Sequence, residues 1–435
     1  MAERKDATAI SRRKLLGIGA GAAGLLFLPS CGRGGGSGNG TLTFQTFGTP
    51  EAEKAFQATI DKYMAKNPDV TVKLDLVPFP QHYQTLDTRL AAGEGPDLVR
   101  IQYQQMGHYS SQGALQDLSE YFPDNYADQY LPNYWEAIVH EGKPYGVPID
   151  TGSHGIFYNA DLFKELRIQP PKTMDEAWSW EEFVAVAKKV KKSGRVKSSF
   201  AVSWQPADNA YRWTSFLYQH GGRLLNDGLS ASRMNSREIE ETIAFTQSWF
   251  EDGLVPASTS IKSGTEIQTL FANGNIGMMI NGDFQMPFLK DSMKANWDVT
   301  YLTQDVAPGN ALGGNGVGVT KDCDEPELAA DFLMFLNNEE WQLRNILATQ
   351  LLPTRKGLSG KSAKELGYEY RPELKDLFIE QLSVVSRAAV GETTGPDFGE
   401  LNQALGDELE AAFKTGQSAS ETADKLHQKV STILK

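Results

Sequence analysis

The side chains that most often carry out catalysis or bind metals are scattered along this chain. Its six histidines stand far apart, and none occurs in an H-E-x-x-H or C-x-x-C arrangement that would hold zinc. The chain contains neither a G-x-S-x-G nucleophile motif nor the glycine-rich loop with lysine that binds nucleotide phosphates. We therefore expect no catalytic residue, no metal site and no cofactor.

Carboxylates are the one reactive group that is abundant, with 55 Asp and Glu residues against 42 Lys and Arg. A pair of carboxylates can hydrolyse a glycosidic bond, but the sequence singles out no such pair, and solvated helix faces account for most of them. The formal net charge is −13. Because so acidic a protein repels phosphate groups, we expect no nucleic-acid partner.

The first thirty residues have the pattern of an export signal. Arg12, Arg13 and Lys14 precede an apolar, glycine-rich stretch at residues 15–28, which is too short to span a bilayer. The paired arginines are typical of the twin-arginine signals that export folded proteins. Cleavage after residue 30 would remove five basic and two acidic residues, which changes the net charge from −13 to −16.

Residues 28–31 resemble a lipobox, in which Cys31 becomes the lipidated first residue of the mature protein. Pro29 departs from the usual composition of that box. Residues 31–40 are rich in glycine and predict a flexible tether. Because Cys31 is used for the lipid, Cys323 has no partner for an internal disulfide. We expect the protein to be anchored to the outer face of the cytoplasmic membrane.

The hydrophobic pattern of the mature chain predicts an α/β fold. Residues 41–47 alternate as a strand, Thr49 and Pro50 begin a helix, and residues 70–76 alternate as a second, parallel strand. A capping box at residues 179–182 begins a helix of a second α/β unit. Since 435 residues exceed one ordinary core, we expect two lobes, each a mostly parallel sheet flanked by helices.

Further elements follow in the second half of the chain. Residues 235–253 and 265–274 have helical patterns, and residues 276–280 form a continuous apolar run that predicts a strand buried on both faces. The chain is predicted to be largely helical from Glu325 onward. The glycine-rich residues 313–318 predict a hinge between the lobes, because glycine gives the backbone the most freedom.

Short strings along the mature chain occur in the same order in a known protein family, and that shared order is more specific than any one string. The strings are Gly95-Pro96-Asp97-Leu98, Gly142 to Pro148, Tyr158-Asn159, Tyr218 to Gly222, Met278 to Gly282 and Leu352 to Arg355. In these strings the chain resembles the bacterial extracellular solute-binding proteins of the sugar class, which serve ABC importers.

The resemblance implies a periplasmic-binding-protein-like fold with a ligand cleft between two lobes. It also implies a sugar-like ligand, permease subunits of an ABC transporter as partners, and a monomer attached to the membrane through its N-terminal lipid. The expected segments are the signal peptide at 1–30, the tether at 31–40, the N-lobe at 41–150 and 319–345, the hinge at 313–318, and the C-lobe at 151–312 and 346–435.

Loops beyond the carboxyl ends of parallel strands are the expected place for the ligand. Glu51 follows the first predicted strand and lies beside a helix N-terminus, where backbone N–H groups can meet ligand oxygens. The resemblance implies that Asp97 accepts hydrogen bonds from sugar hydroxyls, although its place after Gly-Pro equally suits a turn. It also implies that Asp150, near the first crossover between lobes, presents a polar group to the ligand or forms an interlobe turn.

Three tryptophans of the expected C-lobe have different expected roles. Trp204 resembles the tryptophan on which a sugar ring stacks in the second lobe, since the C–H face of a sugar packs on indole. Trp213 and Trp249 fall on helical apolar stripes and are expected in the core.

Five further polar or small residues are candidates near the predicted strand at residues 276–280 and in the glycine-rich segment at 313–318. Asn281, Gly282 and Asp283 end the buried strand, and Asp283 would accept a ligand hydroxyl. Similar proteins usually carry an aromatic residue about where Phe284 stands. Gly314 and Asn315 would either approach the ligand through the backbone or act in the hinge alone.

Arg355 resembles a late arginine that reaches the ligand in similar proteins, with a surface ion pair as its alternative. The resemblance favours a mono- or oligosaccharide ligand captured by hinge closure. A polyol phosphate or another small anionic metabolite is the first alternative and would require Arg355 or a neighbour to bind phosphate. A secreted carbohydrate-active enzyme is the second alternative.

Overall fold

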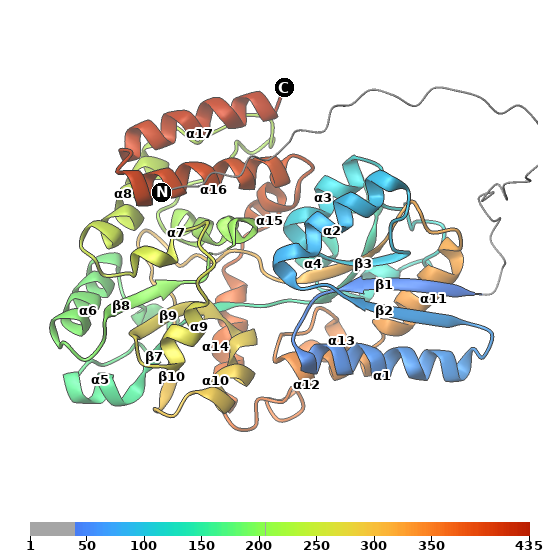
Figure 1. Cartoon of the computed structure of the whole chain (residues 1–435), viewed down its shortest axis with the longest axis horizontal. Helices are drawn as coiled ribbons and strands as arrows, with labels where there is room; N and C mark the ends of the chain where they lie inside the picture. The colour runs from blue at the N-terminus through green and yellow to red at the C-terminus, as the bar shows by residue number, and fades with distance from the viewer. Residues whose placement is uncertain (1–39, 205) are drawn as a thin grey trace, which may run out of the picture. The chain divides into compact units, whose positions relative to one another are not determined.

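Two mixed β-sheets flanked by helices form the part of the chain that the structure describes (Figure 1). This structure is a computed structural model, and the described residues are 40–204 and 206–435. The predicted export signal, the lipobox with Cys31 and almost all of the tether lie outside the described residues. Among the described helices, none has both the length and the apolar character that crossing a bilayer requires.

The first sheet has the strand order β2-β1-β3-β11-β6. The pairs β1–β2 and β1–β3 are parallel, as predicted for the first strand-helix-strand unit, whereas β11 runs antiparallel to both β3 and β6. The sheet is therefore mixed, because its fourth strand, β11, comes from a much later part of the chain and runs in the opposite direction to its two neighbours. The strands are β1 (Thr41–Thr46), β2 (Thr71–Leu76), β3 (Leu98–Gln102), β6 (Gly146–Asp150) and β11 (Asn315–Val319).

The second sheet has the order β10-β7-β9-β8 and is mixed as well. Only β8 and β9 are parallel, while β7 is antiparallel to β9 and to β10. The strands are β7 (His154–Asn159), β8 (Ser198–Val202), β9 (Ile276–Gly282) and β10 (Trp297–Thr300), and a separate ladder joins β4 (Val139–His140) and β5 (Lys143–Pro144).

Helices cover both faces of the first sheet (Figure 1). One face packs against α1 and α11 through a core that includes Phe44, Phe56 and Phe332. The other face packs against α2 and α3 through a core that includes Leu86 and Ile101. The helices of this half are α1 (Pro50–Lys66), α2 (Phe79–Ala92), α3 (Tyr103–Ser111), α4 (Pro132–Glu136), α11 (Pro326–Leu336) and α12 (Glu339–Thr349), with the 3₁₀ helix η1 (Tyr126–Gln129).

The second sheet is likewise flanked by helices (Figure 1). The last two helices of the chain pack against α8 of this half, and α15 contacts α3 and α4 of the first half. The helix α16 contacts α17, α8 and η3, and it also contacts α3 of the first half. The elements are α5 (Ala160–Leu166), α6 (Trp180–Lys192), α7 (Thr214–Gln219), α8 (Arg237–Glu251), α9 (Ile267–Ala272), α10 (Met286–Ser292), α13 (Lys356–Ser359), α14 (Pro372–Ser383), α15 (Arg387–Thr394), α16 (Phe398–Thr415), α17 (Ala419–Ile433), η2 (Met174–Glu176), η3 (Ala207–Trp213), η4 (Ala257–Thr259) and η5 (Asp283–Gln285).

Local sequence signals explain where several helices begin. The Thr49 hydroxyl accepts a hydrogen bond from the Ala52 N–H (3.3 Å) at the start of α1, and Pro50 is the first helical residue. Ser179 and Glu182 form the predicted capping box of α6, with hydrogen bonds of 3.1 and 2.8 Å. Both predicted N-termini are thus confirmed.

Three connections join the two halves, and they lie side by side. These connections are residues 151–153, 301–314 and 350–355. Thr151 exchanges two backbone hydrogen bonds with Leu352 (3.0 and 2.8 Å), and its hydroxyl donates to the Gly313 carbonyl (2.9 Å). The structure corrects one expectation here. Residues 315–318, which we placed in the hinge, are part of β11, because their backbone groups pair on both sides.

Candidate ligand-binding site

The strand ends expected to hold the ligand face each other in the structure. The carboxyl ends of β1, β3 and β6 share one edge of the first sheet, and the carboxyl ends of β8 and β9 share one edge of the second. The Gln102 side-chain amide, at the end of β3, donates to the Asn209 side-chain oxygen in η3 (3.3 Å). This contact brings the two edges together, so a molecule bound there would touch both halves.

A buried ion pair lies at the edge of the first sheet. The Arg100 guanidinium donates to the Asp150 carboxylate (2.7 Å), and a second nitrogen of Arg100 donates to the Phe47 carbonyl (2.9 Å). The guanidinium also lies 4.8 Å from the centroid of the Phe47 ring. Arg100 therefore connects the loop that follows β1 with the first crossover between the two halves.

Asp150 is fully buried and accepts more than one hydrogen bond. The Asn315 side-chain amide, at the start of β11, donates to the second carboxylate oxygen (2.8 Å), and the Tyr103 hydroxyl donates to the Asp150 carbonyl (2.9 Å). Burial, followed by the negative charge of Asp150, raises the pKa of Tyr103 well above its usual range. In this conformation Asp150 serves as a structural acceptor between two segments that join the halves.

Asp283 lies on the opposite side of the same crossover. Its backbone N–H donates to the Ser153 carbonyl (3.0 Å), and its carboxylate accepts from the backbone N–H groups of Ser153 (3.3 Å) and Phe284 (2.9 Å). Burial raises the pKa of Asp283 well above its usual range, and the charge of Asp150 adds to the effect. A protonated carboxyl can donate as well as accept a hydrogen bond.

Asn281 and Gly282 complete the end of β9. Gly282 pairs with His154 and Asn281 pairs with Gly155 across the β7–β9 ladder. The Asn281 side chain is buried, and its oxygen accepts from the Gly282 N–H (2.9 Å). A Cβ atom at Gly282 would lie 2.1 Å from the Phe284 ring, so glycine is required there for Phe284 to fold back over the strand end.

Close backbone approach explains the glycines at the end of the second connection, residues 301–314. A Cβ atom at Gly313 would lie 2.6 Å from the Gly152 carbonyl oxygen, and one at Gly314 would lie 2.4 Å from the Asp150 carbonyl oxygen. Gly314 also has a φ of +118°, which favours glycine. The structure thus brings together Asp150, Gly314 and Asn315 with the end of β9 at Asp283.

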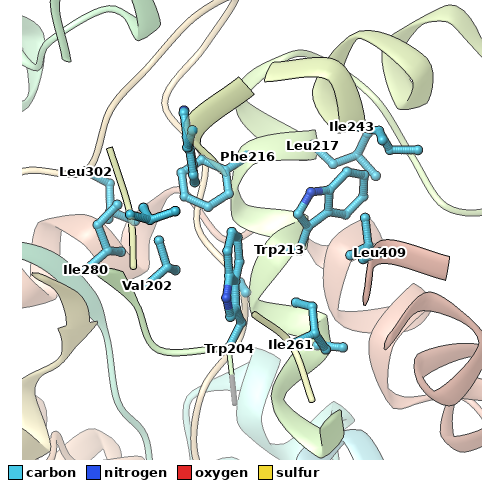
Figure 2. Close-up of a cluster of buried hydrophobic side chains, with 14 of the residues drawn as sticks. Val202, Trp204, Trp213, Phe216, Leu217, Ile243, Ile261, Ile280, Leu302 and Leu409 are labelled. Atoms are coloured by element: carbon cyan, nitrogen blue, oxygen red, sulfur yellow. The ribbon is translucent and has the colours of Figure 1, made fainter. Parts of the chain in front are cut away.

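Trp204 does not have the role that the resemblance implied. Its side chain is fully buried, its indole N–H donates to the Thr259 carbonyl (2.9 Å), and its ring stacks near Trp249 and Phe413 with centroid separations of 5.9 and 5.2 Å. Figure 2 shows it within the apolar cluster that also holds Trp213. A ring covered in this way offers no face to a sugar, so Trp204 is a core residue, like Trp213 and Trp249.

Asp97 likewise has a structural role, because its carboxylate is hydrogen-bonded within the first sheet. It precedes β3, at the end of the sheet opposite Gln102. Its carboxylate accepts from the backbone N–H (2.7 Å) and the hydroxyl (2.8 Å) of Thr43, and its own N–H donates to the Thr43 hydroxyl (3.0 Å). This reciprocal pattern ties β3 to β1 and corrects the expectation that Asp97 contacts the ligand.

Arg355 is also held away from the facing edges. Its guanidinium donates to the Tyr130 hydroxyl (3.1 Å), the Asn337 carbonyl (2.8 Å) and the Gln129 side chain. It lies 5.1 Å from the Tyr130 ring centroid and is buried. The structure corrects both expectations for Arg355, because it is neither at the ligand edge nor in a surface ion pair. It fastens the third connection to the first half.

Glu51 remains a candidate by position. It lies in the first turn of α1, after the loop that Arg100 holds, and its side chain is exposed. Elsewhere in residues 40–204 and 206–435, no cluster of three His, Cys, Asp or Glu side chains is arranged to hold a metal ion.

Sequence reasoning missed Arg100, Gln102 and Tyr103, which stand on or directly after β3 at the ligand edge. The signal that could have found them was present, since they end an apolar strand. The rule that pointed to Asp283 at the end of β9 applies equally to the end of β3.

Comparison with known proteins identifies a family with this fold. Residues 48–343 match the sequence profile of the bacterial extracellular solute-binding proteins. The chain belongs to this family. Among curated solute-binding relatives, the maltodextrin-binding protein MdxE of Bacillus subtilis is 24% identical, with 77% of this chain and 78% of that protein covered. A lipoprotein of Streptomyces antibioticus is 25% identical, with 76% and 74% covered.

Solved structures of solute-binding proteins share the fold. The ABC substrate-binding protein Lmo0181 from Listeria monocytogenes, in complex with cycloalternan, superposes with a TM-score of 0.77 at 23% identity, with 91% of this chain and 98% of that chain covered. The expected two-lobed α/β fold is therefore confirmed. The three side-by-side connections described above are the segments through which the two halves of this solute-binding protein are joined.

Proposed function

We propose that this solute-binding protein is the substrate-binding component of an ABC importer and captures an oligosaccharide between the facing edges of its two sheets. The observation that carries the proposal is the contact of Gln102 with Asn209, which joins the carboxyl edges of both sheets. Ligands of open α/β sheets bind at such edges. Of two proteins that this chain resembles, MdxE is named as a maltodextrin-binding protein and Lmo0181 was solved in complex with cycloalternan.

A thermal-shift screen of the mature protein against neutral oligosaccharides, monosaccharides and sugar phosphates tests the proposal. Ligand at about 100 times its Kd adds roughly 2.7 kcal/mol to the free energy of unfolding, which gives a clear rise in Tm. Calorimetry on each hit then gives the Kd. If no saccharide raises the Tm at millimolar concentration, the proposed ligand class is wrong.

The polyol-phosphate alternative required Arg355 or a neighbour to bind the phosphate. The Arg355 guanidinium is bonded to Tyr130 and Asn337, so Arg355 does not fill that role, and the sugar phosphates in the screen test whether another cation does. Turnover of the saccharide distinguishes the enzyme alternative from a binding protein. Chromatography of each hit after overnight incubation with the protein should return it unchanged, and a cleaved saccharide would favour the enzyme.

We further propose that binding closes the hinge, with residues 41–150 and 319–345 moving against residues 151–312 and 346–435. Thr151, Gly313 and Leu352 lie together where the connections meet, which suits rotation about one place. Small-angle scattering should show a smaller radius of gyration with saturating ligand and the mass of a monomer. An unchanged radius, with an apo state shown to be open, contradicts closure.

The protein is proposed to be exported and held by a lipid on Cys31, with permease subunits as its partners. A relative from Streptomyces antibioticus is itself called a lipoprotein, and residues 28–31 carry the lipobox pattern. Cys31→Ser should release the protein from the membrane fraction. Replacing Arg12 and Arg13 by lysine should block export. If both variants are still exported and membrane-bound, this localisation is wrong.

A further inference from the structure

A second group of polar side chains meets at the ligand edge, and none of the roles above uses it. Arg212 lies in η3, three residues after Asn209, and His154 begins β7 opposite Gly282. Phe284, in η5, places its ring 5.6 Å from the Arg212 guanidinium carbon. Three elements of the second half therefore converge where η3 touches the first sheet.

The hydrogen-bonding capacity of this group is only partly used. One terminal nitrogen of Arg212 donates to the Ser203 carbonyl (2.5 Å) and the Ser203 hydroxyl (3.0 Å). Its Nε atom is buried and has no hydrogen-bond partner among the described residues. The ion pairs formed by the described residues do not include Arg212. A guanidinium offers five donors in a fixed fork, so most of this one remains available.

His154 is the second incompletely bonded side chain. It is 5% exposed, and within the described chain neither ring nitrogen has a partner of good geometry, although Asn310 lies close to it. Burial, followed by the charge of Arg212, lowers the pKa of His154 to about 3. The ring is therefore neutral, with one N–H donor and one acceptor. Buried polar groups normally find a partner, so a bonding partner for this group is required.

We propose that Arg212 and His154 form a subsite that binds two neighbouring oxygen atoms of the saccharide. The oxygens come from vicinal hydroxyls or from the carboxylate of an acidic sugar, since both present paired acceptors to the guanidinium fork. The ring of Phe284 packs against one side of the guanidinium. The hydrogen bonds to Ser203 fix the position of one terminal nitrogen. This inference rests on the proposed function, because it names which residues bind the saccharide.

Calorimetry on the mature protein tests the subsite, with maltotriose as the neutral probe and trigalacturonate as the acidic probe. Arg212→Gln removes the charge and the fork, and Arg212→Lys keeps the charge alone. Each should weaken binding of the recognised probe by about tenfold to a hundredfold. His154→Gln should weaken it less. Arg344→Gln is the matched control, because exposed Arg344 also lies over an aromatic ring, that of Trp341 (4.9 Å).

The Tm of each unliganded variant separates a binding role from a structural one. The expected result is a loss of affinity in Arg212→Gln with the apo Tm within a few degrees of wild type. A lower Tm with unchanged affinity overturns the subsite and leaves Arg212 as a structural residue satisfied by water. Wild-type affinity in both Arg212 variants, with either probe bound, overturns this inference alone. If neither these probes nor the wider screen binds to wild type, the proposed function fails and the inference fails with it.

Discussion

Arg100 and Asp150 form an ion pair whose side chains are 4% and 0% exposed, and the pair joins the loop after β1 to the first crossover. Asp150→Ala would leave the guanidinium of Arg100 buried without its counter-charge. We expect the free energy of unfolding to fall by about 3–5 kcal/mol in urea denaturation. Asp75→Ala breaks the half-exposed pair with Arg89 and should cost about 1 kcal/mol or less. Equal effects of the two substitutions would contradict the prediction.

Trp204→Ala should remove a fully buried indole from the core of the second half. We expect a loss of about 3–5 kcal/mol in the free energy of unfolding, because a cavity forms between Trp249 and Phe413. Trp297→Ala, at a partly exposed ring, should cost clearly less. If instead Trp204→Ala keeps the stability of wild type but loses ligand affinity, the stacking role that the sequence suggested was correct.

His220 should make stability depend on pH. Its ring nitrogens bond to Asp305 (2.5 Å) and Glu241 (2.8 Å), and its ring stacks on Trp180 (5.0 Å). Burial lowers its pKa, but the two carboxylates together outweigh burial, so the folded pKa is raised above the usual value. The added stability is present below about pH 6.5 and is lost as the pH rises through the folded pKa.

Urea midpoints measured from about pH 6 to about pH 9 test this pH dependence. Wild type should lose stability across the range, and His220→Gln should lack that component of the loss. His108→Gln is the control, because among the described residues the His108 ring shares hydrogen bonds only with Gln112, the residue that follows its own helix. A His220→Gln profile parallel to that of wild type would contradict the prediction.

Gly314→Ala should destabilise the second connection. The added Cβ would lie 2.4 Å from the Asp150 carbonyl oxygen, and the φ of +118° is strained for alanine. We expect a loss of about 1–3 kcal/mol in the free energy of unfolding. Gly264→Ala adds a methyl group that meets nothing within 4 Å and should be neutral. Thermal unfolding of both variants by circular dichroism makes the comparison.

Features that depend on neighbouring residues could be predicted from the sequence. The cap at Thr49, the capping box of Ser179 and Glu182 and the parallel pair β1–β2 depend on a few adjacent positions. Asp283 was also found at the expected edge, because a strand end fixes the location of the residue after it. Local signals therefore predicted the strands and helices that the sequence analysis named, and part of the candidate site.

Features decided by distant partners could not be predicted. Trp204 is buried by Trp249 and Phe413, which are distant in the sequence, and the residues next to Trp204 do not indicate that its ring is covered. Arg355 is held by Tyr130, more than two hundred residues earlier in the chain. The direction of β11 depends on where the second connection returns to the first sheet. Each error arose where a tertiary contact decides between two uses of the same residue type.

The position of β11 also limits when the protein can fold. This strand lies between β3 and β6, yet its residues follow the whole second sheet in the chain. Without it, β6 has no neighbour in the first sheet, so a nascent chain that has reached only residue 314 can assemble the second sheet but only the β2-β1-β3 part of the first. Completion of the first sheet waits until synthesis has passed Val319. For most of translation the earliest residues made therefore remain in need of protection from aggregation.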